Sequence, residues 1–256
     1  TLSAIAWYIS ERSKYNDHGG MASEYPSDDI EAFVHSGRIV FDRYQVEDFR
    51  AGCRSPKWRG EVYGRSASGE EALNGLRFSE EKGGGLWVWA KPEIDAEERV
   101  EHRYVVAVDI GGRGAKADWS VVVVIDRLNL MDGGRPCVVA QWRGHIDHDL
   151  LAWKAAQIAK WYDDALLVIE ANTLETRDKN RSVDGDQSGF ILNLVKDAYP
   201  NLYARKRSPE DIKEGAPAKY GFHTNTATKP AIISHLQSCV REHSWTERDE
   251  RALDEL

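Results

Sequence analysis

The stretch Tyr104-Val-Val-Ala-Val-Asp109 is an apolar, β-branched run that ends in a carboxylate, and Gly111 and Gly112 follow it closely. Such a run, bounded by glycines, is typical of a buried strand. A second run, Ala165-Leu-Leu-Val-Ile169, also leads into an acid, Glu170. Two buried strands that each carry an acid at the C-terminal end can place two carboxylates side by side.

From residue 104 onward the expected elements follow a regular order. Strands are predicted at 104–109, 120–126, 137–142, 165–170 and 202–205, and helices at 149–163, 189–198 and 230–243. In this mixed α/β order, a right-handed crossover through the first helix can return the fourth strand beside the first strand. The two acids then meet at one end of the sheet. We therefore predict an α/β fold with a ribonuclease H-like mixed sheet flanked by helices.

The rest of the chain has weaker patterns. Residues 1–50 are expected to be mostly helical, with cap-like residues at 27–29 before a short helix. Residues 51–75 are rich in Gly, Ser and Arg and are interpreted as a connection, and a strand is expected at 86–89. A charged helix is expected to begin near residue 246. These patterns predict a partly helical N-terminal segment, 1–60, followed by an α/β domain, 61–256.

Composition excludes several classes of protein. None of the apolar stretches approaches the roughly 20 residues that a membrane helix needs. The three cysteines are isolated, which argues against a zinc site or a disulfide framework. The formal charge of −8 weighs against a nonspecific nucleic-acid binder. If DNA is the substrate, its affinity must come from local basic patches, metal ions or partners.

The paired acids predict a metal site. Asp109 and Glu170 are oxygen ligands of the kind that Mg²⁺ or Mn²⁺ prefers, and two such ions can promote phosphodiester hydrolysis. Asp118, which lies beyond the Gly-rich loop, is a further candidate ligand. Acids also end strands as ordinary turn residues, and Asp118 can equally close a hairpin. Both interpretations stay open at this point, although the element order favours the metal site for the first two acids.

Two other groups have a functional and a structural interpretation. His145 and His148 can serve a metal or a proton transfer, but loop and helix-cap roles are the simpler expectation. Arg205, Lys206 and Lys229 belong to the most basic stretch of the chain and are candidate phosphate contacts. Acidic residues interleave with this stretch, so a solvated surface is the alternative.

Four segments of the sequence, taken in order, resemble the large terminase subunits of tailed bacteriophages. Each motif alone is weak, but their order is fairly specific, and the resemblance covers most of residues 20–256. The segments are Glu24-Tyr-Pro-Ser-Asp-Asp-Ile-Glu-Ala-Phe33 with Val40-Phe41-Asp42, Tyr104–Gly112 with Ala117-Asp-Trp-Ser-Val121, Leu167-Val-Ile-Glu-Ala-Asn172, and Lys219-Tyr-Gly-Phe-His-Thr-Asn-Thr-Ala-Thr-Lys-Pro230.

The resemblance implies an endonuclease that cuts concatemeric double-stranded DNA during packaging in the cytoplasm of the bacterial host. It implies Asp109 and Glu170 as metal ligands for two Mg²⁺ or Mn²⁺ ions, Asp118 as a further acid, and Lys229 as a substrate contact. The terminase small subunit and the portal protein are the implied partners. Residues 1–60 would be the end of the ATPase domain, and residues 61–256 the nuclease domain.

The sequence departs from the family pattern in two ways. It contains no G-x-x-x-x-G-K-[ST] motif, so we expect no ATP site in this chain. It also has no third acidic motif after Glu170, and Asp249 and Asp254 are poor substitutes because they lie in a charged helical run. We expect the third acid, and the C-terminal end of the domain, beyond Leu256.

Two other functions remain as alternatives. Asp109-Ile-Gly-Gly112 on a first strand, followed by a hairpin, is also how kinases of the actin and sugar-kinase type hold ATP phosphates. Those enzymes need a second Gly-rich loop, where residues 165–256 instead supply Glu170-Ala-Asn-Thr173. A non-catalytic docking module is the other alternative, favoured by the acidic balance and the nine tryptophans.

Overall fold

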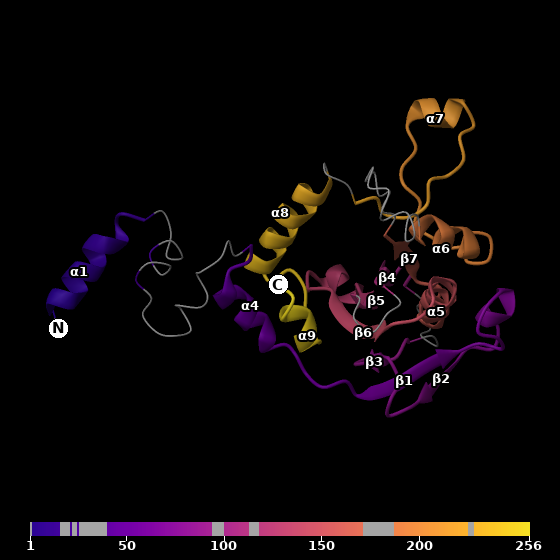
Figure 1. Ribbon diagram of the computed structural model, residues 1–256, viewed down its shortest axis with the longest axis horizontal. Coiled ribbons are helices and arrows are strands. Elements are labelled where there is room, and N and C mark those ends of the chain that lie inside the picture. The colour runs from indigo at the N-terminus through magenta and orange to yellow at the C-terminus, as the bar shows by residue number, and fades with distance from the viewer. Residues whose placement is uncertain are drawn as a thin grey trace.

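The protein is described here by a computed structural model, which is shown in Figure 1. The structure describes residues 2–15, 21, 25, 40–93, 100–112, 118–170, 187–224 and 228–256. The short helix expected after residues 27–29 and the centre of the Gly-rich loop, 113–117, lie outside these ranges. None of the described helices combines the length and the apolar character that crossing a membrane requires.

A seven-stranded mixed sheet forms the centre of the fold. Its strands are β1 (Trp58–Tyr63), β2 (Arg77–Glu80), β3 (Leu86–Val88), β4 (Tyr104–Asp109), β5 (Ser120–Asp126), β6 (Cys137–Gly144) and β7 (Leu166–Ile169). Their order across the sheet is β2-β1-β3-β6-β5-β4-β7. All neighbours are antiparallel except β4 and β7, which are parallel. The predicted ribonuclease H-like mixed sheet, with the fourth strand returned beside the first, is confirmed.

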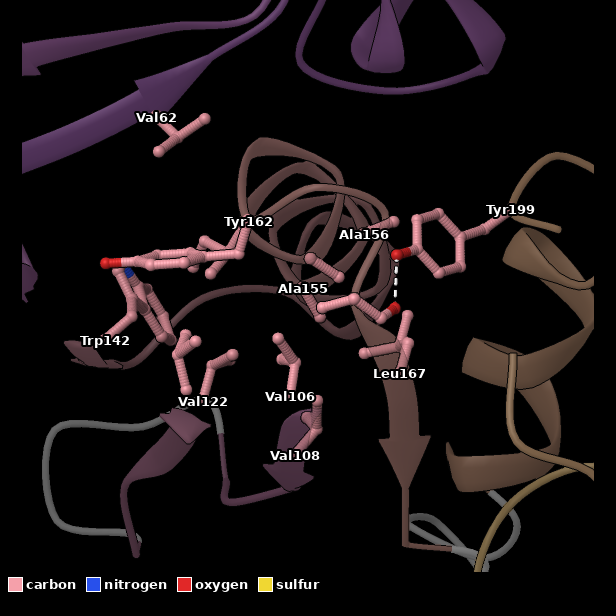
Figure 2. Close-up of a cluster of buried hydrophobic side chains, with 14 of the residues drawn as sticks. Val62, Val106, Val108, Val122, Trp142, Ala155, Ala156, Tyr162, Leu167 and Tyr199 are labelled. Carbon is pink, nitrogen blue, oxygen red and sulfur yellow. Dashed lines mark hydrogen bonds between the residues drawn. The ribbon is translucent and has the colours of Figure 1, made fainter. Parts of the chain in front are cut away.

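Helix α5 (His148–Trp161) makes the crossover from β6 to β7 and packs with α6 (Gln187–Val195) over one face of the sheet. Its Ala155 and Ala156 are fully buried above the apolar side chains of the strands (Figure 2). Small residues on the helix let it approach the sheet closely, while Val106 and Leu167 fill the space below. The main core therefore holds β4 and β7 together.

The sheet lies between α5 and a second group of helices, which are seen with it in Figure 1. This group comprises α4 (Arg43–Arg50), α8 (Thr228–Arg241) and α9 (Glu250–Leu253), and it has its own small core of Val46, Phe49, Val240 and Leu253. The backbone of Thr246 pairs with β6, and buried Asp249 accepts a hydrogen bond from Gln141. Because both faces of β6 are covered, residues 138–142 are all buried.

The interpretation of residues 51–75 as a connection is wrong. This segment contains β1 and the 3-10 helix η1 (Glu70–Leu73), and β2 follows directly. The three-strand extension of β1, β2 and β3 broadens the sheet beyond the core expected from residue 104 onward. Gly60 of β1 has no room for a side chain, because a Cβ there would lie 1.9 Å from the carbonyl oxygen of Ser79 on β2. The glycine that suggested a loop thus allows two strands to approach.

Several expected elements are shorter than predicted. The strand expected at 202–205 is reduced to isolated bridges, in which Leu202 pairs with Leu167 and Ala204 pairs with Tyr220. Between Ala204 and Tyr220 the chain projects from the sheet and carries α7 (Pro209–Lys213) at its tip (Figure 1). The charged helix that was expected to begin near residue 246 is shorter and consists of α9 alone. The remaining elements are α1 (Leu2–Arg12), which Figure 1 shows apart from the sheet, and the 3-10 helix η2 (Leu128–Asp132).

Tyr199 offers a test of how α6 and β7 are joined. Its buried hydroxyl donates a hydrogen bond of 2.5 Å to the carbonyl of Ala165, just before β7, drawn as the dashed line in Figure 2. We expect Tyr199→Phe to lower the free energy of unfolding by about 1–3 kcal/mol, because it leaves this carbonyl without its donor. Urea denaturation measures the change. Tyr63→Phe is the matched control: its hydroxyl also donates a hydrogen bond, to Glu81 at 3.2 Å, but both groups stay accessible to water, so stability should change by less than about 0.5 kcal/mol.

Candidate functional site

The two predicted acids meet at one edge of the sheet. Asp109 is the last residue of β4, and Glu170 directly follows β7. The parallel register pairs Val108 with Ile169, so the next residue on each strand reaches the same edge. The amide of Glu170 donates to the carbonyl of Val108 at 3.2 Å, and its own position is bridged to Phe222. The carboxyl groups of Asp109 and Glu170 lie within reach of each other, so that protonated Asp109 can donate a hydrogen bond to Glu170.

This arrangement changes the acidity of Asp109. Asp109 is exposed at the edge of the sheet, but the neighbouring protein removes part of its hydration. This loss of hydration, followed by the hydrogen bond and the charge of Glu170, raises the pKa of Asp109 to about 6. A hydrogen bond from the amide of Ile110 opposes the rise, and the charge of Glu255 adds a smaller contribution to it. Two carboxyl groups in contact cannot both ionise without cost. In the absence of a cation, Asp109 therefore holds a proton up to mildly acidic pH.

Hydrogen bonds fix the backbone beyond Asp109. Gly111 and Gly112, called the glycine turn below, begin the loop that connects β4 to β5. The amide of Gly111 donates to the hydroxyl of buried Ser120 at 3.0 Å, and the amide of Gly112 donates to the carbonyl of Asp118 at 2.9 Å. A Cβ on Gly111 would lie 2.3 Å from the carbonyl oxygen of Asp118, so only glycine fits there. The carbonyls of the two glycines contact ring nitrogens of His148 and His145. Hydrogen bonds therefore hold both glycines by their amides and by their carbonyls.

The pair fits part of a magnesium or manganese site. Mg²⁺ is commonly held by one or two carboxylates with water in the remaining positions, and the chain supplies two such groups on rigid strand ends. Within the described ranges, no three His, Cys, Asp or Glu side chains come together as a group that can hold a metal ion. Asp118 closes the hairpin through its backbone and is not brought into such a group. A metal role for Asp118, and a second ion, stay predictions.

Two of the three candidate DNA contacts, Arg205 and Lys206, lie near the same edge. The amide of Arg205 pairs with the carbonyl of Lys219, and this pair closes the base of the projection that carries α7. Lys206 is exposed just beyond it. The returning chain reaches Phe222, which bridges to Glu170. Lys229 is exposed in the first turn of α8. Arg205 and Lys206 thus leave the sheet close to the end of β7, although their contact with DNA stays a prediction.

Trp119 is a neighbour of the site that the sequence interpretation missed. It is exposed, its ring packs at a tilt of 31° against His145 with centroids 3.9 Å apart, and the guanidinium of Arg143 lies 4.7 Å from its ring. The register between β5 and β6, which pairs Val121 with Arg143, brings these residues together. The signal available in the sequence was a tryptophan next to a Gly-rich loop. Its partners were not visible without the strand register.

The fold and the acid pair define an α/β protein of the ribonuclease H-like class with a two-carboxylate site. In structure, the chain is similar to the large terminase nuclease from thermophilic phage G20c, a crystal structure with bound magnesium. The match covers 69% of this chain and 71% of that chain, with 19% sequence identity and a TM-score of 0.43. No protein-family model and no curated protein matches the sequence. At this level of similarity, functional residues have to be identified from the chain itself.

The acidity of Asp109 predicts a pH-dependent stability in the absence of metal. Because its pKa is raised from 3.8 to about 6, the folded state binds this proton more tightly than the unfolded chain does. The stabilising contribution is complete below the unfolded pKa and is lost as pH rises through about 6. Relative to Asp109→Asn, the wild-type protein should lose on the order of 1 kcal/mol of unfolding free energy across this window, after allowance for solvent screening.

Urea denaturation in the presence of a chelator, at intervals between pH 4 and pH 7, measures this difference. Asp132→Asn is the control, because it removes an exposed acid in η2, at the other end of β5 from the acid pair. The wild-type protein and this control should change in parallel with pH. A constant difference between the wild-type protein and Asp109→Asn would contradict the raised pKa.

Proposed function

We propose that this chain is the endonuclease part of a phage DNA-packaging terminase and hydrolyses phosphodiester bonds of double-stranded DNA with Mg²⁺ or Mn²⁺. The observation that carries the proposal is the contact between the carboxyl groups of Asp109 and Glu170 at the edge formed by β4 and β7. The order of the sequence motifs supports the same assignment. The terminase small subunit and the portal protein are the partners that the assignment implies.

The two acids have distinct tasks in this proposal. A bound divalent cation supplies positive charge that stabilises the negative charge developing on the phosphate. Glu170 is held by its backbone hydrogen bond to Val108 and provides a fixed ligand. Asp109 must give up the proton that it holds below about pH 6 before it can bind the cation. Metal affinity and cleavage should therefore rise together as the pH increases through this value.

A second ion requires further ligands. Asp118 is the candidate that we propose, because the hydrogen bond from Gly112 keeps its backbone across the hairpin from the residues that follow Asp109. Glycines at 111 and 112 let the backbone pass close to a ligand. The two-ion mechanism rests on this additional acid and on the pair already described.

We propose Arg205, Lys206 and Lys229 as contacts to the DNA backbone. The protein carries a formal charge of −8, so a polyanion is repelled overall and must be attracted locally. The projection at 205–219 contains five basic and three acidic residues and is therefore a positive element on an acidic protein. Its base adjoins the end of β7, and this supports a contact with DNA close to the acid pair.

Cleavage of supercoiled plasmid in the presence of Mn²⁺ tests the nuclease assignment. We expect the wild-type protein to produce nicked and linear DNA, and a chelator to stop the reaction. Asp109→Asn and Glu170→Gln should both abolish cleavage, because each removes a ligand from the pair. Asp132→Asn, with the same change of charge away from the site, should cut like the wild-type protein.

Unchanged cleavage by both acid variants would refute the assignment. Thermal unfolding separates the alternatives: Mn²⁺ should raise the melting temperature of the wild-type protein but not that of Asp109→Asn, and ATP should leave both unchanged. A rise with ATP alone would instead indicate a nucleotide-binding kinase fold. The absence of any metal or DNA effect would indicate a docking module.

The DNA contacts predict a specific salt dependence. For each phosphate contact that is removed, the slope of log affinity against log salt concentration should decrease by about 1. We therefore expect Lys206→Ala and Lys229→Ala each to weaken binding of a short duplex and to flatten its salt dependence. Fluorescence anisotropy with cleavage-deficient Asp109→Asn as the background measures both. Lys82→Ala removes an exposed lysine between β2 and β3 and is the control; an equal effect there would refute a specific contact.

A further inference from the structure

Two histidines from one short segment reach the backbone that follows Asp109. His145 and His148 lie between the end of β6 and the first turn of α5. The Nδ1 atom of His145 is 3.2 Å from the carbonyl oxygen of Gly112, and the Nε2 atom of His148 is 3.1 Å from that of Gly111. A carbonyl oxygen only accepts, so both ring nitrogens must donate. The two histidines thus use different ring atoms for consecutive carbonyls.

Both rings are held in place by their surroundings. His148 is buried, with only 6% of its surface exposed, and it begins α5, which lies over the main core. His145 packs against the ring of Trp119, which the guanidinium of Arg143 also contacts. The Nε2 atom of His145 is itself buried and has no hydrogen-bond partner among the described residues. This atom is therefore badly placed to exchange a proton with a substrate, and a structural use of the ring is favoured.

The histidines complete the hydrogen bonding of the glycine turn. The amides of Gly111 and Gly112 are already paired with Ser120 and Asp118, and the histidines pair the two carbonyls. Every backbone polar group of the two glycines therefore has a partner. Glycine is the residue with the most conformational freedom to lose, so a Gly-Gly turn keeps one conformation only if such contacts hold it. Ile110 alone separates this turn from Asp109.

We propose that His145 and His148 are positioning residues for the acid pair. By fixing the carbonyls of Gly111 and Gly112, they keep the end of β4 in the conformation that holds the Asp109 carboxyl group against Glu170. The inference rests on the proposed function, because it assigns the histidines to the support of a metal site. In this proposal they neither bind the metal nor transfer a proton to or from the substrate. They act only through the backbone.

The use of two different ring nitrogens allows a sharp test. The amide nitrogen of Asn occupies nearly the same place as Nδ1 of histidine, and that of Gln nearly the same place as Nε2. We expect His145→Asn and His148→Gln to preserve function. His145→Gln and His148→Asn carry the same amide group at the wrong reach and should behave like the alanine variants. If the histidines only filled space, the effects of the variants would follow side-chain size and would not show this crossed pattern.

The measurements are Mn²⁺ binding by calorimetry and the kinetics of plasmid cleavage. Partners of metal ligands commonly contribute 10–100-fold to metal affinity or activity. We therefore expect His145→Ala and His148→Ala to weaken Mn²⁺ binding by about 10-fold or more and to lower kcat, with little change in KM for DNA. Faster hydrogen exchange of the amides of Gly111 and Gly112 should accompany the loss, and Asn at 145 or Gln at 148 should restore all three.

Alanine variants that bind Mn²⁺ and cut DNA like the wild-type protein would overturn the inference, as would rescue that follows size. Circular dichroism checks folding, and if buried His148 proves essential for it, the three variants of His145 decide the question alone. A wild-type protein that neither binds Mn²⁺ nor cuts DNA would overturn the proposed function itself. In that event, unchanged hydrogen exchange of the glycine amides would separately show that the histidines do not hold the turn.

Discussion

The parallel pairing of β4 with β7 is the constraint on which the candidate site depends. Side chains alternate between the two faces of a strand, so a slip of one residue exchanges the faces and shifts the strand end. Buried Val108 and Ile169 are paired in the observed register, whereas Ala107 and Val168, which precede them, are only half-buried. A slip would bury the wrong side chains under α5 and would also separate the two acids. The packing of the core thus specifies the geometry of the site, although no acid belongs to the core.

The acid pair opposes the stability that the core provides. Placing Asp109 against Glu170 raises the pKa of Asp109, so at neutral pH ionisation of the pair disfavours the folded state. The surrounding structure holds the two groups together in spite of this repulsion, through the strand register on one side and the glycine turn on the other. A divalent cation would convert the repulsion into attraction. Strained titratable pairs of this kind gather at functional sites more often than elsewhere.

The sequence predicts the elements that have long apolar patterns better than those that depend on contacts between distant segments. The run that ends at Asp109 and the spacing in α5 were sufficient for the crossover and for the meeting of the two acids. The strand β1 was missed because its alternation includes Gly60, whose reason is the close approach of Ser79 from another strand. Similarly, the roles of His145 and His148 depend on carbonyls more than thirty residues away. Nothing in the local pattern of the histidines specifies those partners.

The outer edge of β7 is covered by the two ends of the projection that carries α7. An uncovered edge strand presents free backbone groups and invites association, so folds commonly cover it. Here the amides of Tyr203 and Phe222 donate to the carbonyls of Leu167 and Ile169 on β7, and the chain between them projects as the basic element that carries α7. Because both ends of the projection are fixed to the sheet, its tip can change in length or charge without moving Glu170. In the proposed function, contacts with DNA can therefore vary independently of the acids.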